Sequence, residues 1–195
     1  MNAEIIFLIQ IDSKSQQQGF VESRLPHFTP SESLEIQGSA DFLGFNHYSS
    51  GLVYPTPVDE INPNIVSRDA DSDVSGFKDP KWYKSSSDWL TVTPFGFRRN
   101  LNWLSKYGKP IIVTENGFSD YIGNLDDMQR VYYYKHYINQ MLKGKIILFA
   151  ILFTRLHYLL IRVSKLLAIK LDGVDVHGYF AWSLMDNMEW TRGYS

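Results

Sequence analysis

The stretch Pro110-Ile111-Ile112-Val113-Thr114-Glu115-Asn116-Gly117 indicates a short buried strand that ends in polar residues. The same pattern occurs twice more in the chain. Residues 40–45 run into Asn46-His47-Tyr48, and residues 178–184 are followed by the polar stretch 186–190. Short, nearly continuous apolar runs are typical of parallel strands that are covered on both faces. The sequence therefore predicts a parallel sheet with polar residues at the carboxyl ends of its strands.

Two helices are predicted before and between the later strands. Residues 94–107 have an amphipathic pattern that ends at Gly108, a residue suited to the position after a helix. Residues 126–143 begin with two acids and carry an apolar stripe, expected to face the core, of Met128, Val131, Tyr134, Ile138, Met141 and Leu142. Alternating strands and helices indicate an α/β fold. The Pro-, Asp- and Ser-rich stretch 54–87 is too long for a plain connection and predicts a surface excursion.

The composition excludes several classes of protein. The 195 residues include 19 Lys and Arg against 21 Asp and Glu, and this net charge of −2 does not fit a nucleic-acid-binding protein. Hydrophobic residues make up 44%, which is enough for a folded core. Aromatic residues reach 15%, which suits a packed core or a cleft lined with rings. Because cysteine is absent, disulfides, thiolate metal ligands and cysteine nucleophiles are excluded.

Glu115 is the strongest candidate for a catalytic group. In α/β folds the catalytic residues gather at the carboxyl ends of parallel strands, where loops converge above a packed interior. A carboxylate between a buried strand and Asn-Gly is held by a rigid scaffold, although an acid that caps the following turn has the same pattern. Glu189 also fits an exposed loop acid, and Trp182 and Trp190 also fit aromatic residues of the core.

Three motifs together resemble the β-glucosidases of glycoside hydrolase family 1. They are Asp-Phe-Leu-Gly-Phe-Asn-His-Tyr at 41–48, Val-Thr-Glu-Asn-Gly-Phe at 113–118 and the aromatic stretch 178–190. The resemblance covers about residues 13–195 apart from one segment. It implies a partial (β/α)8 TIM barrel, with roughly the sixth to eighth strands and their helices. The whole chain, 1–195, is then expected to be the C-terminal part of a single barrel domain.

The resemblance implies a retaining β-glycosidase that acts on a β-glycoside substrate. Glu115 takes the place of the family's nucleophile, and Tyr48 that of the tyrosine whose hydroxyl holds the nucleophile in position. Retaining hydrolysis needs a second, protonated carboxyl group about 5–5.5 Å away. In the family this group belongs to a Thr-x-Asn-Glu-Pro segment, which the sequence does not contain. We therefore expect the chain to be inactive alone.

The same resemblance implies the residues that bind the substrate. Asn46 matches the family position beside the nucleophile at a strand end. Trp182 is expected to form the platform for the sugar ring, and Glu189 and Trp190 to hydrogen-bond the sugar's hydroxyl groups. An indole against the ring's C–H groups and a carboxylate across two hydroxyls suit the recognition of a sugar.

One segment does not fit the resemblance, the apolar insertion at 144–167. Lys143 should continue directly into Ala168. The codons at both ends can contain splice signals, so a translated intron is one hypothesis, and a genuine apolar helix extension or membrane-seeking segment is the other. Arg155, His157 and Arg162 interrupt the segment, and its longest uncharged run is shorter than the ~20 residues of a membrane span. No membrane association is expected.

No cofactor and no metal are predicted. The five histidines lack metal-binding spacing, and the sequence has no Gly-rich phosphate loop. The acidic stretch 69–73 begins like a calcium loop but has Val74 where the turn glycine belongs, which favours a solvated acidic loop. Glu4 before the apolar run 5–11 does not fit a signal peptide. The resemblance is compatible with a secreted or a lysosomal location. The sequence predicts no oligomeric state.

A second function class stays open beside the glycosidase. Three strands cannot close a barrel, and the edge strands would remain unpaired. A non-catalytic sugar-binding remnant, or an inactive fragment from a faulty gene model, is therefore the alternative hypothesis.

Overall fold

The computed structural model of the chain describes residues 3–57, 60, 62, 64–120, 123, 125–142, 172–185, 187–190, 193 and 194. The chain divides into two compact units. Unit 1 comprises residues 1–39 and 51–79, and unit 2 comprises residues 40–50 and 80–195. The insertion predicted at 144–167 lies outside the described residues.

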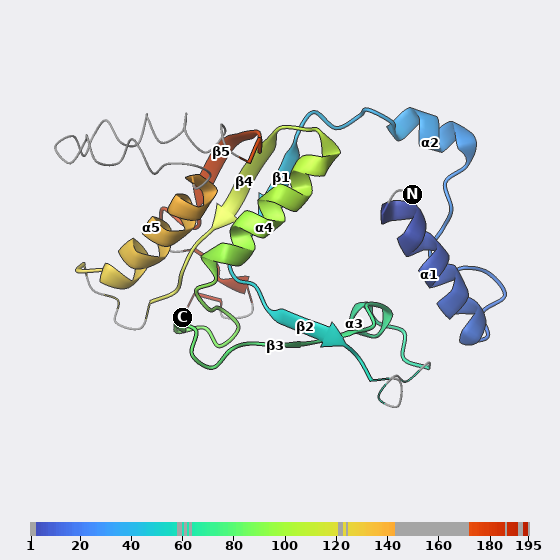
Figure 1. The fold of residues 1–195 in the computed structure, drawn as a ribbon, viewed down its shortest axis with the longest axis horizontal. Coiled ribbons are helices and arrows are strands. Elements are labelled where there is room, and N and C mark those ends of the chain that lie inside the picture. The colour runs from blue at the N-terminus through green and yellow to red at the C-terminus, as the bar shows by residue number, and fades with distance from the viewer. Residues whose placement is uncertain are drawn as a thin grey trace. The chain divides into compact units, whose positions relative to one another are not determined.

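Unit 2 is built on a three-stranded parallel sheet in the order β1-β4-β5 (Figure 1). The strands are β1 (Leu43–Asn46), β4 (Ile111–Asn116) and β5 (Val176–Ala181). The three predicted strands and their parallel arrangement are thereby confirmed. Their ends differ from the prediction: β5 begins two residues earlier, and β4 continues through Glu115 and Asn116 because backbone groups from both neighbouring chain segments bond to these two residues.

Two helices cover one face of this sheet (Figure 1). Helix α4 (Pro94–Leu104) runs into the 3-10 turn η2 (Ser105–Tyr107), and Gly108 follows with φ of 63°, as its place after a helix predicted. Helix α5 (Met128–Leu142) matches the second predicted helix within two residues. The core between helices and sheet consists of Leu90, Phe97, Leu101, Ile111, Val113, Phe118, Tyr133, Tyr137 and Val174.

The expectation that apolar side chains cover both faces of the strands is wrong for β5. Phe180, in this strand, is 60% exposed, and the neighbouring Ala181 is exposed too. Asn46 and Thr114, which bond to each other, are likewise exposed. Among the described residues, α4 and α5 pack on one face only, so the other face keeps accessible side chains.

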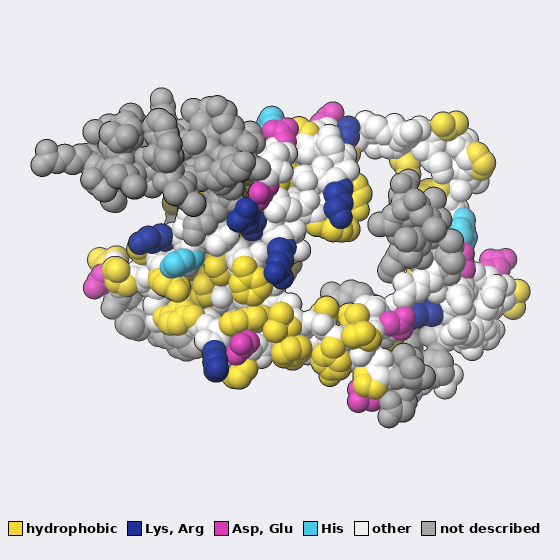
Figure 2. Space-filling model, viewed as in Figure 1, with side chains coloured by type: hydrophobic (Ala, Val, Ile, Leu, Met, Phe, Trp, Pro, Cys, Tyr) yellow, Lys and Arg dark blue, Asp and Glu magenta, His cyan; other side chains and the backbone are white. Residues whose placement is uncertain are grey.

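The predicted core face of α5 is confirmed only in part, because Tyr134 and Met141 pack against the core but other members of the stripe do not. Met128 and Val131 are 63% and 55% exposed, whereas Tyr133 and Tyr137 are fully buried. Figure 2 shows hydrophobic side chains along and below α5 on the surface of unit 2. The helix is rotated relative to the apolar stripe because tyrosine hydroxyls find hydrogen-bond acceptors inside unit 2, described below. The predicted stripe includes Tyr134 but neither Tyr133 nor Tyr137, because apolar spacing alone does not show where a tyrosine hydroxyl finds an acceptor.

Unit 1 contains α1 (Ala3–Gln17), α2 (Pro30–Ile36) and a short helix, α3 (Arg68–Asp71). Strands β2 (Leu52–Pro55) and β3 (Val74–Phe77) pair antiparallel. The stretch 54–87 is largely exposed, as a surface excursion predicts, but part of it pairs as strands. Its first part returns as a strand, and the cross-strand contact of Tyr54 with Phe77 supports the pairing.

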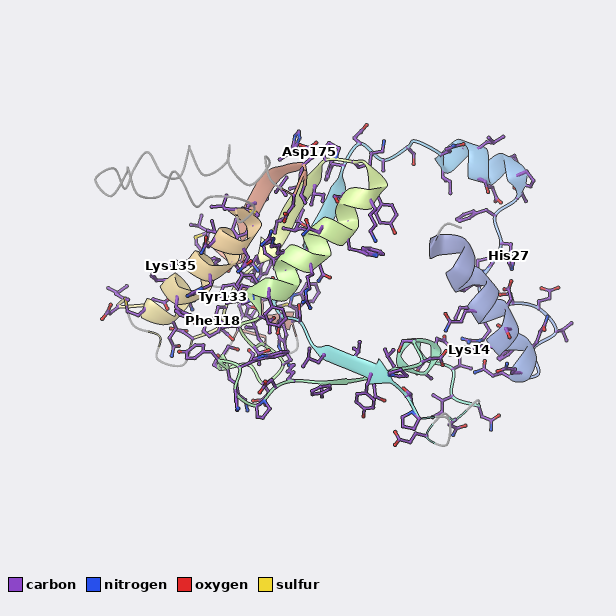
Figure 3. All side chains as sticks on the ribbon, in the orientation of Figure 1. Lys14, His27, Phe118, Tyr133, Lys135 and Asp175 are labelled. Atoms are coloured by element: carbon purple, nitrogen blue, oxygen red, sulfur yellow. The ribbon has the colours of Figure 1, made fainter. Side chains whose placement is uncertain are left out.

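The acidic stretch 69–73 is not a solvated loop. Arg24 binds Asp71 through both of its terminal nitrogens at 2.7 and 3.1 Å, and Lys14 (Figure 3) binds Asp73 at 2.6 Å. The hydrogen bonds from Arg24 lower the pKa of Asp71. These acids therefore hold α3 and β3 against the segment that begins with α1.

No helix of the described part of the chain is both long and apolar enough to cross a membrane.

Phe97→Ala is expected to lower the free energy of unfolding by about 3–5 kcal/mol, because it removes a fully buried ring that contacts Phe45, His47 and Tyr137. Phe95→Ala, on the same helix but with a ring that is 38% exposed, is the matched control and should cost about 1 kcal/mol or less. Urea unfolding followed by fluorescence measures both losses. Equal losses would contradict this placement of the core.

Candidate active site

The carboxyl ends of the three strands meet at one edge of the sheet. Asn46 ends β1, Glu115 and Asn116 end β4, and Trp182 directly follows β5. The backbone N–H of His47 donates to the Glu115 carbonyl at 3.0 Å, and that of Trp182 donates to the Asn116 carbonyl at 2.9 Å. Figure 3 shows Tyr133 toward this end of the sheet and Asp175 at the opposite end, where β5 begins. The polar residues that follow the three strands are thus tied to neighbouring backbone.

The Tyr48 hydroxyl donates a hydrogen bond to the Glu115 carboxylate at 2.5 Å, as the resemblance implies. Burial is the main reason why the pKa of Tyr48 is raised far above its usual value, followed by the hydrogen bond to Glu115 and the negative charges of Glu115 and Glu189. Tyr48 therefore stays protonated at neutral pH and acts as a donor. Its bond to a half-buried carboxylate limits where the Glu115 oxygens can point.

Asn46 is fixed beside Glu115 by its own hydrogen bond. The Thr114 hydroxyl donates to the Asn46 side-chain oxygen at 2.5 Å, and both residues are exposed. Since the oxygen accepts from Thr114, the amide group of Asn46 remains the end that can donate to a ligand.

Asn116 connects the segments behind the site. Its side chain is fully buried, and its amide nitrogen donates to the His47 carbonyl at 2.5 Å and to the Tyr133 hydroxyl at 2.8 Å. Its side-chain oxygen accepts from the Tyr179 hydroxyl at 2.5 Å. Both the nitrogen and the oxygen of this buried amide are therefore hydrogen-bonded, and their bonds join β4 to α5, to β5 and to the residue that follows β1.

Gly117 lets Trp182 approach the end of β4. A Cβ atom at this position would lie 2.1 Å from the Trp182 carbonyl oxygen, closer than any side chain allows. The Tyr134 hydroxyl donates to the same carbonyl at 3.2 Å. The peptide bond between Trp182 and Ser183 is cis. The Asn-Gly pair that follows Glu115 is thus explained by two contacts, the buried amide and the close approach of Trp182.

Glu189 and Trp190 lie in the turn that follows β5, and both are exposed. The Glu189 N–H donates to the Gly193 carbonyl at 2.7 Å, and the Trp190 carbonyl accepts from the Gly193 N–H at 3.1 Å. The negative charge of Glu189 contributes to the raised pKa of Tyr48. Trp190 is 73% exposed, and its described hydrogen bond lies within its own turn. Of the six predicted residues, Glu189 and Trp190 are the two whose described hydrogen bonds stay within their own turn.

Trp89 is a residue of this site that the sequence interpretation missed. Its ring stands edge-on to Tyr48, with centroids 5.7 Å apart and planes at 82°, and the residue is 57% exposed. An exposed aromatic face beside the Tyr48–Glu115 pair offers an apolar surface to a ligand. Because Trp89 lies in a loop far from the three motifs, only the fold brings it here.

Within the described ranges no group of three or more His, Asp or Glu side chains is arranged to hold a metal ion.

Comparison with known proteins assigns this arrangement to a family. The chain matches "Glycosyl hydrolase family 1" over residues 8–147 and 153–195. The chain belongs to this family. It is 41% identical to human lactase/phlorizin hydrolase over 189 residues, which are 95% of this chain and 8% of that protein. It is 36% identical to myrosinase 1 of Brevicoryne brassicae over 188 residues, which are 95% of this chain and 34% of that protein.

Solved structures of family 1 enzymes share the fold of the chain. An aphid myrosinase superposes with a TM-score of 0.72 at 34% identity, over 97% of this chain and 35% of that one. A rice β-glucosidase mutant, in covalent complex with glucose, gives a TM-score of 0.69 at 28% identity, over 98% and 38%. The chain thus has a partial α/β fold of the glycosyl hydrolase family 1 kind. It spans about a third or less of the length of these relatives.

The stability of this family 1 chain should depend on pH through His47. Burial among Phe45, Phe97 and Tyr137 lowers the pKa of His47 to about 4, from 6.5. The unfolded chain therefore takes up a proton at a higher pH than the folded one. The free energy of unfolding should be unaffected by His47 above about pH 6.5, fall by about 3 kcal/mol between pH 6.5 and 4, and change no further below that.

Urea unfolding at a series of pH values measures this dependence, with His47→Phe as the reference that cannot titrate. The difference between the two proteins should follow the stated pH range. Parallel curves for the two proteins would show that His47 is not buried in its neutral form.

Proposed function

We propose that the chain supplies the nucleophile half of a retaining β-glycosidase site, with Glu115 as the nucleophile. One observation carries the proposal: the Tyr48 hydroxyl bonds the Glu115 carboxylate at 2.5 Å, at the carboxyl ends of adjacent parallel strands. A carboxylate oriented in this way can attack the anomeric carbon of a β-glycoside. The bond to the leaving oxygen then breaks, and water later hydrolyses the glycosyl ester. The covalent glucose complex of the rice relative supports the same type of intermediate.

The acid that protonates the leaving oxygen must come from outside the residues described here. Within the proposal, β1, β4 and β5 correspond to the sixth, seventh and eighth strands of a (β/α)8 barrel. The upstream strands would then carry the second carboxyl group, in the Asn-Glu-Pro segment that this sequence lacks. The length of the relatives supports this assignment, since the chain spans about a third of several of them.

The remaining residues of the site are proposed to bind the sugar. Trp182 offers its indole as a platform, and Asn46 offers an amide group beside Glu115. Glu189 is proposed to accept hydrogen bonds from sugar hydroxyls, which its exposure supports. Trp190 is the neighbouring donor through its indole N–H.

The 195-residue chain alone is expected not to hydrolyse an aryl β-glucoside above the buffer background. Retaining hydrolysis needs both carboxyl groups, and general acid catalysis contributes about 10²–10⁴-fold by itself. Release of the phenol by purified protein is the measurement, with Glu115→Gln as the control for contaminating enzymes. If the unmodified chain turns the substrate over and this variant does not, the proposal that the chain lacks the acid is contradicted.

In the polypeptide encoded by the longest transcript that contains this chain, Glu115 is expected to form the covalent intermediate. A 2-deoxy-2-fluoro β-glucoside with a good leaving group should accumulate it, and peptide mapping should find the sugar on Glu115. Glu115→Ala should abolish turnover, and azide should restore part of it by attacking from the vacated side, giving a glycosyl azide of inverted configuration.

Glu189→Ala is the matched control for this prediction. It should weaken discrimination between gluco- and galacto-configured substrates and show no azide rescue. A label on Glu189, or on any residue other than Glu115, would refute the assignment. If the longest polypeptide binds glucosides but neither turns over nor takes up the label, the sugar-binding alternative is supported instead.

A further inference from the structure

We propose that Tyr133 and Tyr137 are positioning residues for Glu115, acting through the backbone of Tyr48. Both hydroxyls donate to the same acceptor, the Tyr48 carbonyl oxygen, at 2.7 and 2.9 Å. A carbonyl oxygen has two lone pairs, so these two bonds fill its capacity. The proposal rests on the proposed function only in naming Glu115 as the nucleophile.

The two tyrosines form one rigid unit. They stand four residues apart on α5, their rings stack with centroids 4.0 Å apart, and neither is exposed to solvent. Burial raises the pKa of both, so both remain protonated donors. A phenylalanine would fill nearly the same space without the desolvation of a buried hydroxyl. Packing alone therefore does not account for two tyrosines at these positions.

Each hydroxyl is itself held in direction by a donor. The Asn116 amide donates to the Tyr133 hydroxyl at 2.8 Å, and the Thr93 backbone N–H donates to the Tyr137 hydroxyl at 3.0 Å. A hydroxyl that accepts from one side has its proton free for the other side, where the Tyr48 carbonyl lies. The Tyr48 backbone is thus fixed from β4, from α5 and from the segment that precedes α4.

Fixing this backbone fixes the Tyr48 phenol, and through it the Glu115 carboxylate. The bond from phenol to carboxylate is 2.5 Å long, and bonds this short weaken with small displacements. The carbonyl of the preceding residue, His47, is held by the Asn116 amide, so two successive peptide units are anchored. The position of Glu115 therefore depends on residues that touch neither the carboxylate nor a sugar.

The test is proton NMR of the 195-residue chain at neutral pH. A short phenol–carboxylate bond gives a far-downfield proton signal, assigned to Tyr48 by its loss in Tyr48→Phe. In Tyr137→Phe and Tyr133→Phe we expect this signal to move upfield, with its exchange with water faster by about 2–10-fold, the factor for one lost hydrogen bond. Tyr132→Phe, on the same helix but half exposed and packed against Tyr83 and His136, should leave it unchanged.

Leu101→Ala separates positioning from general loss of stability. Leu101 is buried on α4 and its side chain makes no hydrogen bonds, so this variant should lower stability without moving the signal. An unmoved signal in both tyrosine variants, or a signal moved equally by Leu101→Ala, would overturn the proposal. If Tyr133→Phe does not fold, Tyr137→Phe alone decides. Because the signal reports a hydrogen bond and not turnover, its outcome is independent of the labelling of Glu115.

Discussion

The buried amide of Asn116 is the interaction on which the candidate site depends. It bonds the carbonyl that follows β1, the Tyr133 hydroxyl of α5 and the Tyr179 hydroxyl of β5. An isolated polar group at zero exposure is destabilising, but one whose partners are all satisfied holds them in fixed geometry. Because Asn116 directly follows Glu115, the same peptide segment carries the proposed nucleophile and the amide that joins the surrounding elements. The asparagine of the Thr-Glu-Asn-Gly motif therefore has a structural role, which is to hold the segments around Glu115 together.

Helix α5 contributes more than an apolar face. Three of its tyrosines send hydroxyls to two loops: Tyr133 and Tyr137 bond the Tyr48 carbonyl, and Tyr134 bonds the Trp182 carbonyl. Helix α5 thus holds the backbone of both Tyr48, which bonds the proposed nucleophile, and Trp182, the proposed platform for the sugar. Because these three hydroxyls come from one helix, the carbonyls of Tyr48 and Trp182 are both bonded to the same element.

The sequence predicted the features that depend on local pattern. Nearly continuous apolar runs marked β1, β4 and β5, Gly108 marked the end of the α4 segment, and the motif at β4 marked Glu115. Features that depend on partners distant in sequence were missed. The pairing of β2 with β3, the binding of Asp71 by Arg24 and the full burial of two tyrosines of α5 all require contacts that no local pattern contains. Trp89 belongs to the same class, since only the fold brings it to Tyr48.

The place of Glu115 on the central strand suits the role proposed for it. Its carbonyl accepts from His47 on one side, and the carbonyl of the next residue accepts from Trp182 on the other, so its backbone is bonded toward both neighbouring strands. A nucleophile must hold its position to within a fraction of an ångström, since orientation contributes much of the rate. Glu189 instead follows β5 in an exposed turn that is bonded to Gly193. Such a turn tolerates small shifts, which a residue that recognises sugar hydroxyls can accommodate and a nucleophile cannot.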